Sequence, residues 1–197
     1  MPSRYKSALL FGTPGVGKGT QGKFLGQLTG FHHLACGDVF RSLDKASELG
    51  KQFLAYSTRG ELVPDDLTIT MWKENVKTRI AEGRYRPAQD LLVLDGIPRN
   101  PVQAAALEGS IEVLKIIHLT CRDEDAMVAR MKSRALKEQR PDDADEQVVR
   151  NRFDVYRKET APVLSCYPTS LIAEIDAIGT PNEVLQRVLA VLEPLRT

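Results

Sequence analysis

The sequence predicts a single domain with a doubly wound α/β fold, in which helices cover both faces of a five-stranded parallel sheet. Two observations support this prediction. Short apolar segments alternate with longer segments of helical spacing, and the first apolar segment runs into a glycine-rich turn. The five expected strands are residues 7–11, 31–35, 90–94, 113–119 and 171–175.

Individual elements have their own signals. Residues 91–94 are Leu-Leu-Val-Leu, which is typical of a strand buried on both faces. After Pro64, apolar side chains recur at helical spacing through residues 65–81. Pro141 disfavours helix at Arg140 and interrupts a charged helical stretch. The expected helices are residues 18–28, 37–46, 49–58, 65–81, 101–107, 123–137, 146–158 and 182–195.

Composition and charge indicate a soluble globular protein. Of 197 residues, 42% are hydrophobic and 27% are charged, and the formal net charge is +1. This balance would attract neither a nucleic-acid polymer nor an anionic membrane, so an anion site needs a local cluster of arginines. The sequence has no 18-residue apolar run and no signal-peptide pattern. Its three cysteines are widely spaced, which argues against disulfides and a cysteine zinc site and favours a reducing cytoplasm.

The stretch from Gly12 to Thr20 has the pattern of a phosphate-binding loop. Its glycines let backbone N–H groups turn toward an anion, and the following helix adds partial positive charge at its N-terminus. Lys18 would lie beside the β- and γ-phosphates, and Thr20 would face Mg²⁺ or its water shell. The alternative is a glycine-rich turn with an incidental lysine. The strand and helix on either side favour the loop.

This loop and several later motifs resemble the adenylate kinase family of nucleoside monophosphate kinases. The resemblance covers essentially the whole chain and begins with the order Lys-Gly-Thr in the loop. The later motifs are Gly37-Asp38-x-x-Arg41, Arg59-Gly60-Glu61-Leu62-Val63-Pro64-Asp65, Asp95-Gly96-Ile97-Pro98-Arg99 followed by Gln103, Arg140-x-Asp142-Asp143 followed by Arg152-Phe153-x-x-Tyr156, and Thr160-Ala161-Pro162.

The resemblance implies a P-loop NTPase-like fold with two additions. One is a helical insert at residues 36–65 that binds a nucleoside monophosphate (NMP), and the other is a short lid at residues 134–143. It also implies a monomeric cytoplasmic enzyme of nucleotide biosynthesis that catalyses reversible, Mg²⁺-dependent phosphoryl transfer from ATP to AMP. Alternatives are a UMP/CMP-type monophosphate kinase and a degenerate regulatory member that binds nucleotides without turnover.

The resemblance also implies roles for individual residues. The catalytic set is Lys18, Arg99, Arg134, Arg140 and Arg152. The ATP-binding set is Gly15, Val16, Gly17, Lys18, Gly19, Thr20, Arg130, Arg134 and Thr180. The AMP-binding set is Cys36, Gly37, Arg41, Glu61, Leu62, Val63, Gly96, Ile97, Arg99, Gln103, Arg140 and Arg152. Thr20 and Asp95 would hold Mg²⁺ through water, and no zinc site is expected.

The chemistry of phosphoryl transfer suits this set. Arginine is always charged and binds phosphate oxygens bidentately, although a single arginine is more often a solvated surface residue. The attacking oxygen belongs to the acceptor phosphate and is already anionic, so no general base is required. His32, His33 and His118 therefore fit structural roles. Asp95 has an alternative role as a turn-forming residue before Gly96.

Gln103 favours AMP as the acceptor, since its amide offers one donor and one acceptor to the adenine edge and relatives that prefer UMP or CMP carry asparagine there. Three residues depart from the family pattern. Cys36 replaces a usual serine or threonine, Ile97 replaces an aromatic residue, and Glu61 lies where lysine is common.

Two rival classes remain open at this stage. A phosphate-loop kinase for another small acceptor would share Lys18 and Thr20. A nucleotide-dependent switch is suggested by the D-x-x-G pattern at residues 176–179, but the chain has no Asn-Lys-x-Asp guanine reader. We interpret residues 176–179 as a turn near the adenine pocket of the donor.

Overall fold

A computed structural model describes residues 4–138 and 143–195. Its five strands form one parallel sheet in the order β2-β3-β1-β4-β5, which confirms the predicted fold class. The strands are β1 (Tyr5–Phe11), β2 (Phe31–Ala35), β3 (Leu91–Asp95), β4 (Ile111–Thr120) and β5 (Ile172–Asp176).

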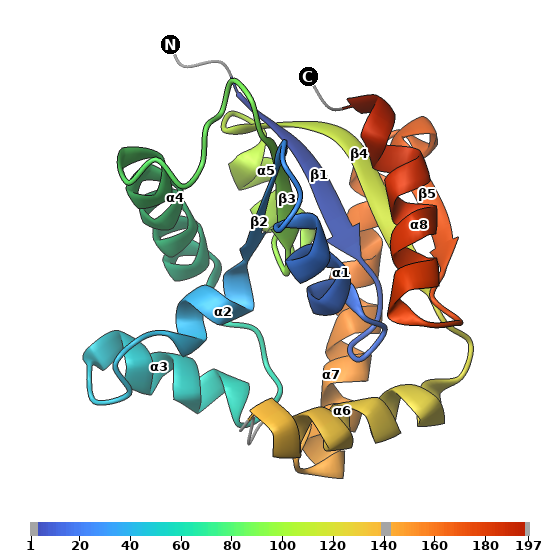
Figure 1. The fold of residues 1–197 in the computed structure, drawn as a ribbon. Helices are drawn as coiled ribbons and strands as arrows, with labels where there is room; N and C mark the ends of the chain where they lie inside the picture. The colour runs from blue at the N-terminus through green and yellow to red at the C-terminus, as the bar shows by residue number, and fades with distance from the viewer. Residues whose placement is uncertain (1–3, 139–142, 196–197) are drawn as a thin grey trace.

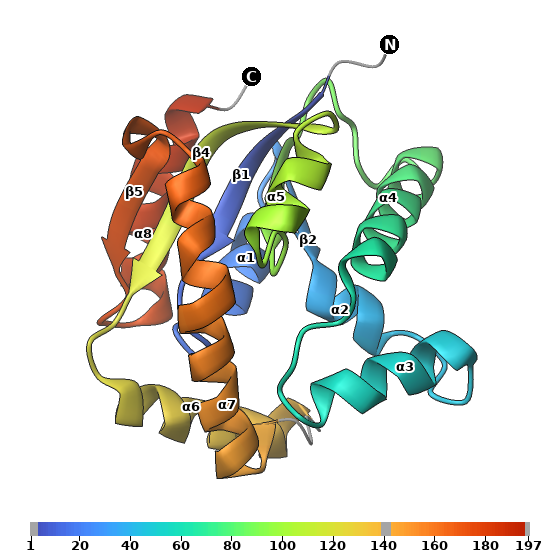
Figure 2. The ribbon, with the colours of Figure 1, turned by 180° about the vertical axis from the view of Figure 1, so that it is seen from behind.

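Helices cover both faces of this sheet (Figures 1 and 2). Helices α1 and α8 lie on one face, and α5 with the helical segment that follows α7 lies on the other. The α-helices are α1 (Lys18–Leu25), α2 (Cys36–Arg41), α3 (Glu48–Ser57), α4 (Asp65–Ala81), α5 (Pro101–Leu107), α6 (Glu124–Glu138), α7 (Glu146–Val155) and α8 (Pro181–Leu192). Within the described residues, no helix has the length and apolar character needed to cross a membrane.

Two hydrophobic cores separate the sheet from its helices, and β1 contributes to both. Ala8 and Leu10 join the core under α1 and α8, whereas Leu9 and Phe11 join the core under α4 and α5. This alternation follows from the two-residue period of a strand. A strand buried on both faces holds its last residue firmly, so the turn that follows β1 has a fixed starting point.

The helix predicted at residues 146–158 continues further than its sequence pattern suggests. After α7, the chain forms a π-helical turn, η2 (Tyr156–Thr160), and a 3₁₀ segment, η3 (Ala161–Cys166). Pro162 has no N–H to donate to the carbonyl four residues earlier, so α-type hydrogen bonding is interrupted here. A π-helical turn is rare and is frequently found at a functional site.

Other boundaries differ by a few residues. Helix α1 ends at Leu25 because Gly26, a poor helix former, comes next. Helix α2 ends at Arg41, five residues before the predicted end at residue 46. Strand β4 is longer than expected because it pairs with β1 along its first part and with β5 along its second.

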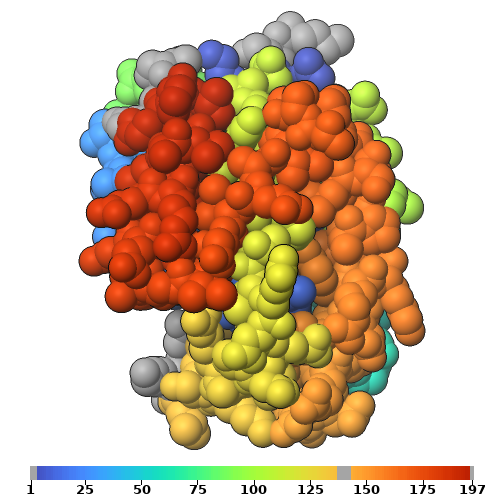
Figure 3. Space-filling model, turned by 90° about the vertical axis from the view of Figure 1, so that its right-hand side faces the viewer, coloured from blue at the N-terminus to red at the C-terminus, as the bar shows by residue number. Residues whose placement is uncertain are grey.

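Two helical groups extend beyond the carboxyl ends of the strands. Helices α2 and α3 project from the end of β2, and α6 with the first part of α7 lies below the sheet (Figure 1). Figure 3, seen from the side of α8, shows α6 beneath α8 and β5. The elements that follow β1, β2 and β3 therefore face one another across the carboxyl edge of the sheet.

Gly12 is the point where the chain leaves β1, and it has no room for a side chain. Its φ is +140°, and a Cβ there would lie 2.4 Å from the carbonyl oxygen of Leu119 and 2.8 Å from Cγ1 of Val16. Both neighbours are buried parts of the core and cannot easily move. Glycine is required here by conformation and by space.

Gly12→Ala should therefore lower the free energy of unfolding by about 3 kcal/mol, since strain and overpacking add. Gly83 provides the matched control, because its φ is +69° but nothing lies within 4 Å of an added Cβ. Gly83→Ala should cost about 1 kcal/mol, from backbone strain alone. Urea unfolding of both variants measures the difference, and equal costs would contradict the role of crowding at Gly12.

Candidate functional site

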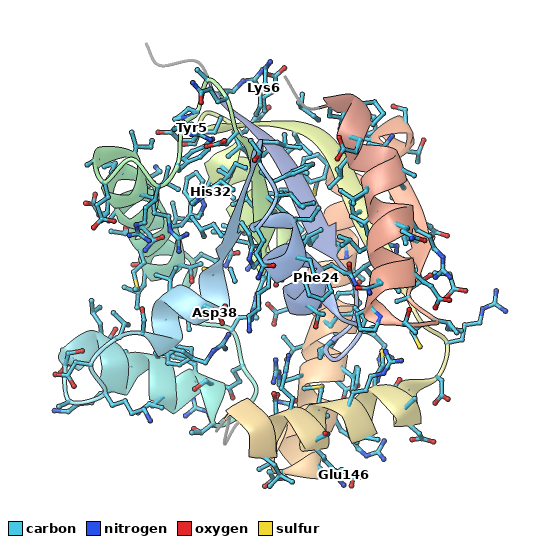
Figure 4. The ribbon with its side chains drawn as sticks, viewed as in Figure 1. Tyr5, Lys6, Phe24, His32, Asp38 and Glu146 are labelled. Atoms are coloured by element: carbon cyan, nitrogen blue, oxygen red, sulfur yellow. The ribbon has the colours of Figure 1, made fainter. Side chains whose placement is uncertain are left out.

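A cleft of about 690 Å³ lies at the carboxyl ends of β1, β2 and β3. The turn after β1, the α2–α3 region, the turn after β3, and helices α6 and α7 all contribute to its lining. Figure 4 places Asp38 of α2 at the margin of this region and Glu146 of α7 on the outer side of the molecule. This is the place where a doubly wound sheet binds its ligand.

The glycine-rich turn forms the floor of the cleft. Helix α1 begins at Lys18, and its first intrahelical hydrogen bond runs from the Gln21 N–H to the Gly17 carbonyl at 3.0 Å. The N–H groups of the preceding helical residues have no carbonyl four residues earlier within the helix, so they can bind an anion. Lys18 Nζ folds back and donates to the carbonyl oxygens of Gly12 at 2.5 Å and Thr13 at 3.0 Å.

Lys18 is the electrostatic centre of the cleft. Burial is the main cause that lowers the pKa of its ammonium group, Asp95 opposes the shift, and repulsion from Arg99, Arg152 and Arg134 adds to it, with a net pKa of about 8. Each of these four residues also lines the cleft. Three arginines from three separate elements therefore act on one lysine, which indicates a site built to receive a dense negative charge.

Two of those arginines share a buried acid. Asp143 is fully buried and bridges Arg134 of α6 and Arg152 of α7. Arg134 Nε donates to Asp143 Oδ2 at 2.8 Å, and Arg152 Nη1 donates to Asp143 Oδ1. Arg130 also lines the cleft, one helical turn before Arg134. Arg140, the remaining predicted phosphate ligand, lies outside the described residues.

The α2–α3 region and the turn after β3 form the opposite wall. Most of the predicted acceptor-site residues that the structure describes line this wall: Cys36, Gly37, Arg41, Glu61, Leu62, Val63, Gly96, Arg99 and Gln103. Arg152 also lines the cleft, but it does so from α7 on the other side. The side chain of Ile97 does not line this wall, since it is only 2% exposed and belongs to the core under α4 and α5.

Two of these residues have distinctive surroundings. Burial raises the pKa of the Cys36 thiol to about 11, so the sulfur is a neutral, weak hydrogen-bonding group at neutral pH. Glu61 is exposed and pairs with Arg59 at 2.7 Å, which lowers the pKa of its carboxyl group. Gln103 is 1% exposed, and its amide is already held by two protein groups.

Thr180 caps α8 instead of lining the cleft. Its side chain accepts from the Glu183 N–H, and its own N–H donates to the Glu183 carboxylate at 2.7 Å. Its neighbours Gly179 and Pro181 do line the cleft, as does Ala177. The D-x-x-G segment is therefore a turn beside the phosphate-binding loop.

Comparison with known proteins gives one family. The family model for adenylate kinase matches residues 10–172. An adenylate kinase from Thermobifida fusca is 38% identical over 191 residues, with 94% of this chain and 97% of the relative covered. Those from Rhodococcus erythropolis (41% identity, 93% and 97% covered) and Synechococcus sp. strain CC9902 (39%, 95% and 100%) are similar over the same extent.

This chain belongs to the adenylate kinase family. The resemblance inferred from the motifs is confirmed, and the chain is a phosphotransferase. Neither rival class, the kinase for another small acceptor nor the nucleotide switch, is favoured by these matches.

The surroundings of Asp95 fit the magnesium that adenylate kinases would use with ATP. Asp95 ends β3, and a Cβ on Gly19 would lie 3.6 Å from its Oδ2, so the carboxylate is next to the first turn of α1. His33 Nε2 is 3.9 Å from the same oxygen. One carboxylate beside a phosphate site is typical of Mg²⁺, which keeps most of its waters. Among the described residues, no three His, Cys, Asp or Glu side chains gather into a metal cluster.

Several cleft residues were not identified from the sequence. Phe40 and Phe53 stack with ring centroids 5.4 Å apart, and both line the cleft together with Ser57 and Gln21. The apolar spacing of the two short helices indicates buried faces, but it does not distinguish a core position from a cleft wall.

Asp143→Ala should lower the free energy of unfolding by about 3 kcal/mol, because it leaves two half-buried guanidinium groups facing each other without their shared acid. Asp154→Ala is the matched control. It removes a carboxylate that pairs with Arg157 at 2.8 Å, but there both side chains are about half exposed (53% and 54%). Its cost should stay below about 1 kcal/mol. Chemical denaturation compares the two variants, and a similar small cost for both would contradict a structural role for Asp143.

Proposed function

We propose that this member of the adenylate kinase family transfers the γ-phosphoryl group of ATP to AMP, giving two molecules of ADP in a reversible, Mg²⁺-dependent reaction. The arrangement around Lys18 carries the proposal. Arg99 approaches this lysine from the wall that includes Cys36 and Gln103, and Arg134 and Arg152 approach it from α6 and α7. Two phosphate-bearing ligands that enter from opposite walls would meet at Lys18.

In this proposal the glycine-rich turn and α1 bind the phosphates of ATP, with the turn at residues 177–181 beside the adenine ring. Residues 36–65 form the NMP-binding insert, where Arg41 and Arg99 hold the acceptor phosphate. The short lid would be residues 134–143, of which residues 139–142 lie outside the described part of the chain. The names of the relatives support ATP and AMP as substrates, and Gln103 supports AMP as the acceptor.

Catalysis would come from position and charge. Lys18 and the arginines neutralise the repulsion between donor and acceptor phosphates, and a cleft closed to water prevents hydrolysis of ATP. Mg²⁺, held through water near Thr20 and Asp95, supplies additional positive charge when it is bound. The acceptor phosphate is its own nucleophile, so the histidines on β2 and β4 have no proton to abstract.

We also propose that the enzyme is a monomer and acts in the cytoplasm as part of nucleotide biosynthesis. Widely spaced free cysteines suit a reducing compartment. Light scattering after size-exclusion chromatography should give the mass of one chain, 21.9 kDa, and a stable dimer would contradict this part of the proposal.

A coupled assay of ADP formation tests the reaction. With ATP as donor, AMP should be used well ahead of CMP, UMP and GMP, and Lys18→Ala should lower kcat by about 10²–10³-fold, the usual cost of one transition-state charge partner. Lys77→Ala is the control, since Lys77 is exposed on α4 and pairs only with Glu74 among the described residues. It should leave turnover unchanged. A clear preference for a pyrimidine monophosphate would contradict the assignment of AMP as the acceptor. Absence of turnover with every acceptor would contradict the proposed reaction.

The pH dependence follows from the lowered pKa of Lys18. In the free protein the ammonium group is lost as the pH rises through about 8, so kcat/KM for ATP should fall above that pH. Bound phosphates favour the charged lysine and raise its pKa, so kcat at saturating ATP should fall only at higher pH. Measurement of kcat/KM for ATP and of kcat between pH 6 and 10 gives the difference between the pH values at which the two constants fall. A kcat/KM that stays flat to pH 9.5 would contradict it.

A further inference from the structure

We propose that Asp65 is a positioning residue that fixes the orientation of the Gln103 amide, and that this orientation makes the acceptor site select a 6-amino purine over a 6-oxo purine. The inference rests on the proposed function, in which Gln103 contacts the acceptor base. It assigns specificity to a carboxylate that does not itself line the cleft.

The hydrogen bonds of Gln103 define which end of its amide is oxygen. Gln103 Nε2 donates to Asp65 Oδ1 at 2.7 Å, and Gln103 Oε1 accepts from the Arg99 backbone N–H at 2.8 Å. A carboxylate can only accept and a backbone N–H can only donate. Rotation of the amide by 180° would oppose acceptor to acceptor and donor to donor, so a single orientation is stable.

The groups that hold this amide are themselves fixed by hydrogen bonds. Asn100 Nδ2 donates to the same Asp65 oxygen at 2.9 Å, and Asn100 Oδ1 accepts from the Gln103 N–H at 2.8 Å as the cap of α5. Gln103 is 1% exposed. One carboxylate at the start of α4 therefore holds both the capping residue of α5 and the amide that faces the cleft, and water has little access to loosen them.

The chemistry of the base then decides what this amide can bind. Its bonds to Asp65 and Arg99 use one N–H and one lone pair, which leaves one N–H and one lone pair for a ligand. Adenine presents a donor at its 6-amino group and an acceptor at N1. Hypoxanthine, the base of IMP, presents an acceptor at O6 and a donor at N1. An amide with a fixed orientation complements only one of these edges. Against the other edge it places donor opposite donor and acceptor opposite acceptor. An amide that could rotate freely would bind both edges.

A simpler role for Asp65 is to stabilise the N-terminus of α4 by its negative charge. Asp66 has the same role, since it lies in the same first turn and is exposed, and it does not line the cleft. Asp66→Ala is therefore the matched control. Any effect that comes from the helix terminus alone will appear in both variants.

The experiment measures kcat and KM for AMP and for IMP at saturating ATP, in the wild type and in Asp65→Ala, Asp65→Asn and Asp66→Ala. The wild type should favour AMP by about 10²-fold or more, the usual effect of a buried polar group left unpaired. Asp65→Ala should raise KM for AMP about 10-fold and reduce the AMP/IMP ratio of kcat/KM about 10-fold, with kcat for AMP within about threefold. Asp66→Ala should match the wild type.

Asp65→Asn is the rescue variant and keeps the inference testable if Asp65→Ala does not fold. Because Gln103 Nε2 and Asn100 Nδ2 donate to the same oxygen of Asp65, an asparagine amide oxygen in that place keeps both bonds, so Asp65→Asn should fold and keep the AMP/IMP ratio close to that of the wild type. An unchanged ratio in Asp65→Ala, a lowered ratio in a folded Asp65→Asn, or equal losses on AMP and IMP would overturn the role of Asp65 and leave the proposed function intact. A wild type that turns over neither AMP nor IMP would overturn the proposed function and the inference together.

Discussion

The structure is governed by the need to hold several positive charges at one edge of a nearly neutral protein. The formal net charge is only +1, yet burial, together with repulsion from three arginines, lowers the pKa of Lys18 to about 8. Such a cluster is unfavourable in the absence of anions, because burial and mutual repulsion act in the same direction. The fold has to supply enough attraction to keep the cluster in place without neutralising it.

The attraction comes from dipoles and from acids placed behind the cations. Lys18 and Arg99 donate to carbonyl oxygens, Lys18 to Gly12 and Thr13, and Arg99 Nε to Gly96 at 3.0 Å. A carbonyl orients a cation but leaves its net charge unchanged. Asp143 lies fully buried between α6 and α7 and aligns two guanidinium groups toward the cleft. Positive charge thus remains available to a ligand, while the geometry of each donor is already set.

Local patterns in the sequence were sufficient for most of the fold. The apolar runs and the glycine-rich turn gave all five strands and the position of Lys18, because period and turn chemistry are properties of neighbouring residues. Contacts between distant segments were not predictable. Nothing local pairs Asp65 with Gln103, 38 positions away, or turns Ile97 into the core while its neighbours Gly96 and Pro98 line the cleft. The aromatic wall of Phe40 and Phe53 likewise depends on how α2 meets α3.

The distribution of ion pairs explains how a protein with almost no net charge can attract polyphosphates. Many arginines and lysines outside the cleft have carboxylate partners on the surface, as in the pairs Arg84–Glu82, Arg157–Asp154 and Lys132–Glu146. These pairs contribute little to stability, but they cancel charge locally. Within the described part of the chain, no carboxylate contacts the ammonium group of Lys18 or the guanidinium group of Arg99, and both residues line the cleft. An anion in the cleft therefore meets positive charge on Lys18 and Arg99 that no contacting carboxylate cancels, and the low dielectric of the protein walls strengthens its attraction there.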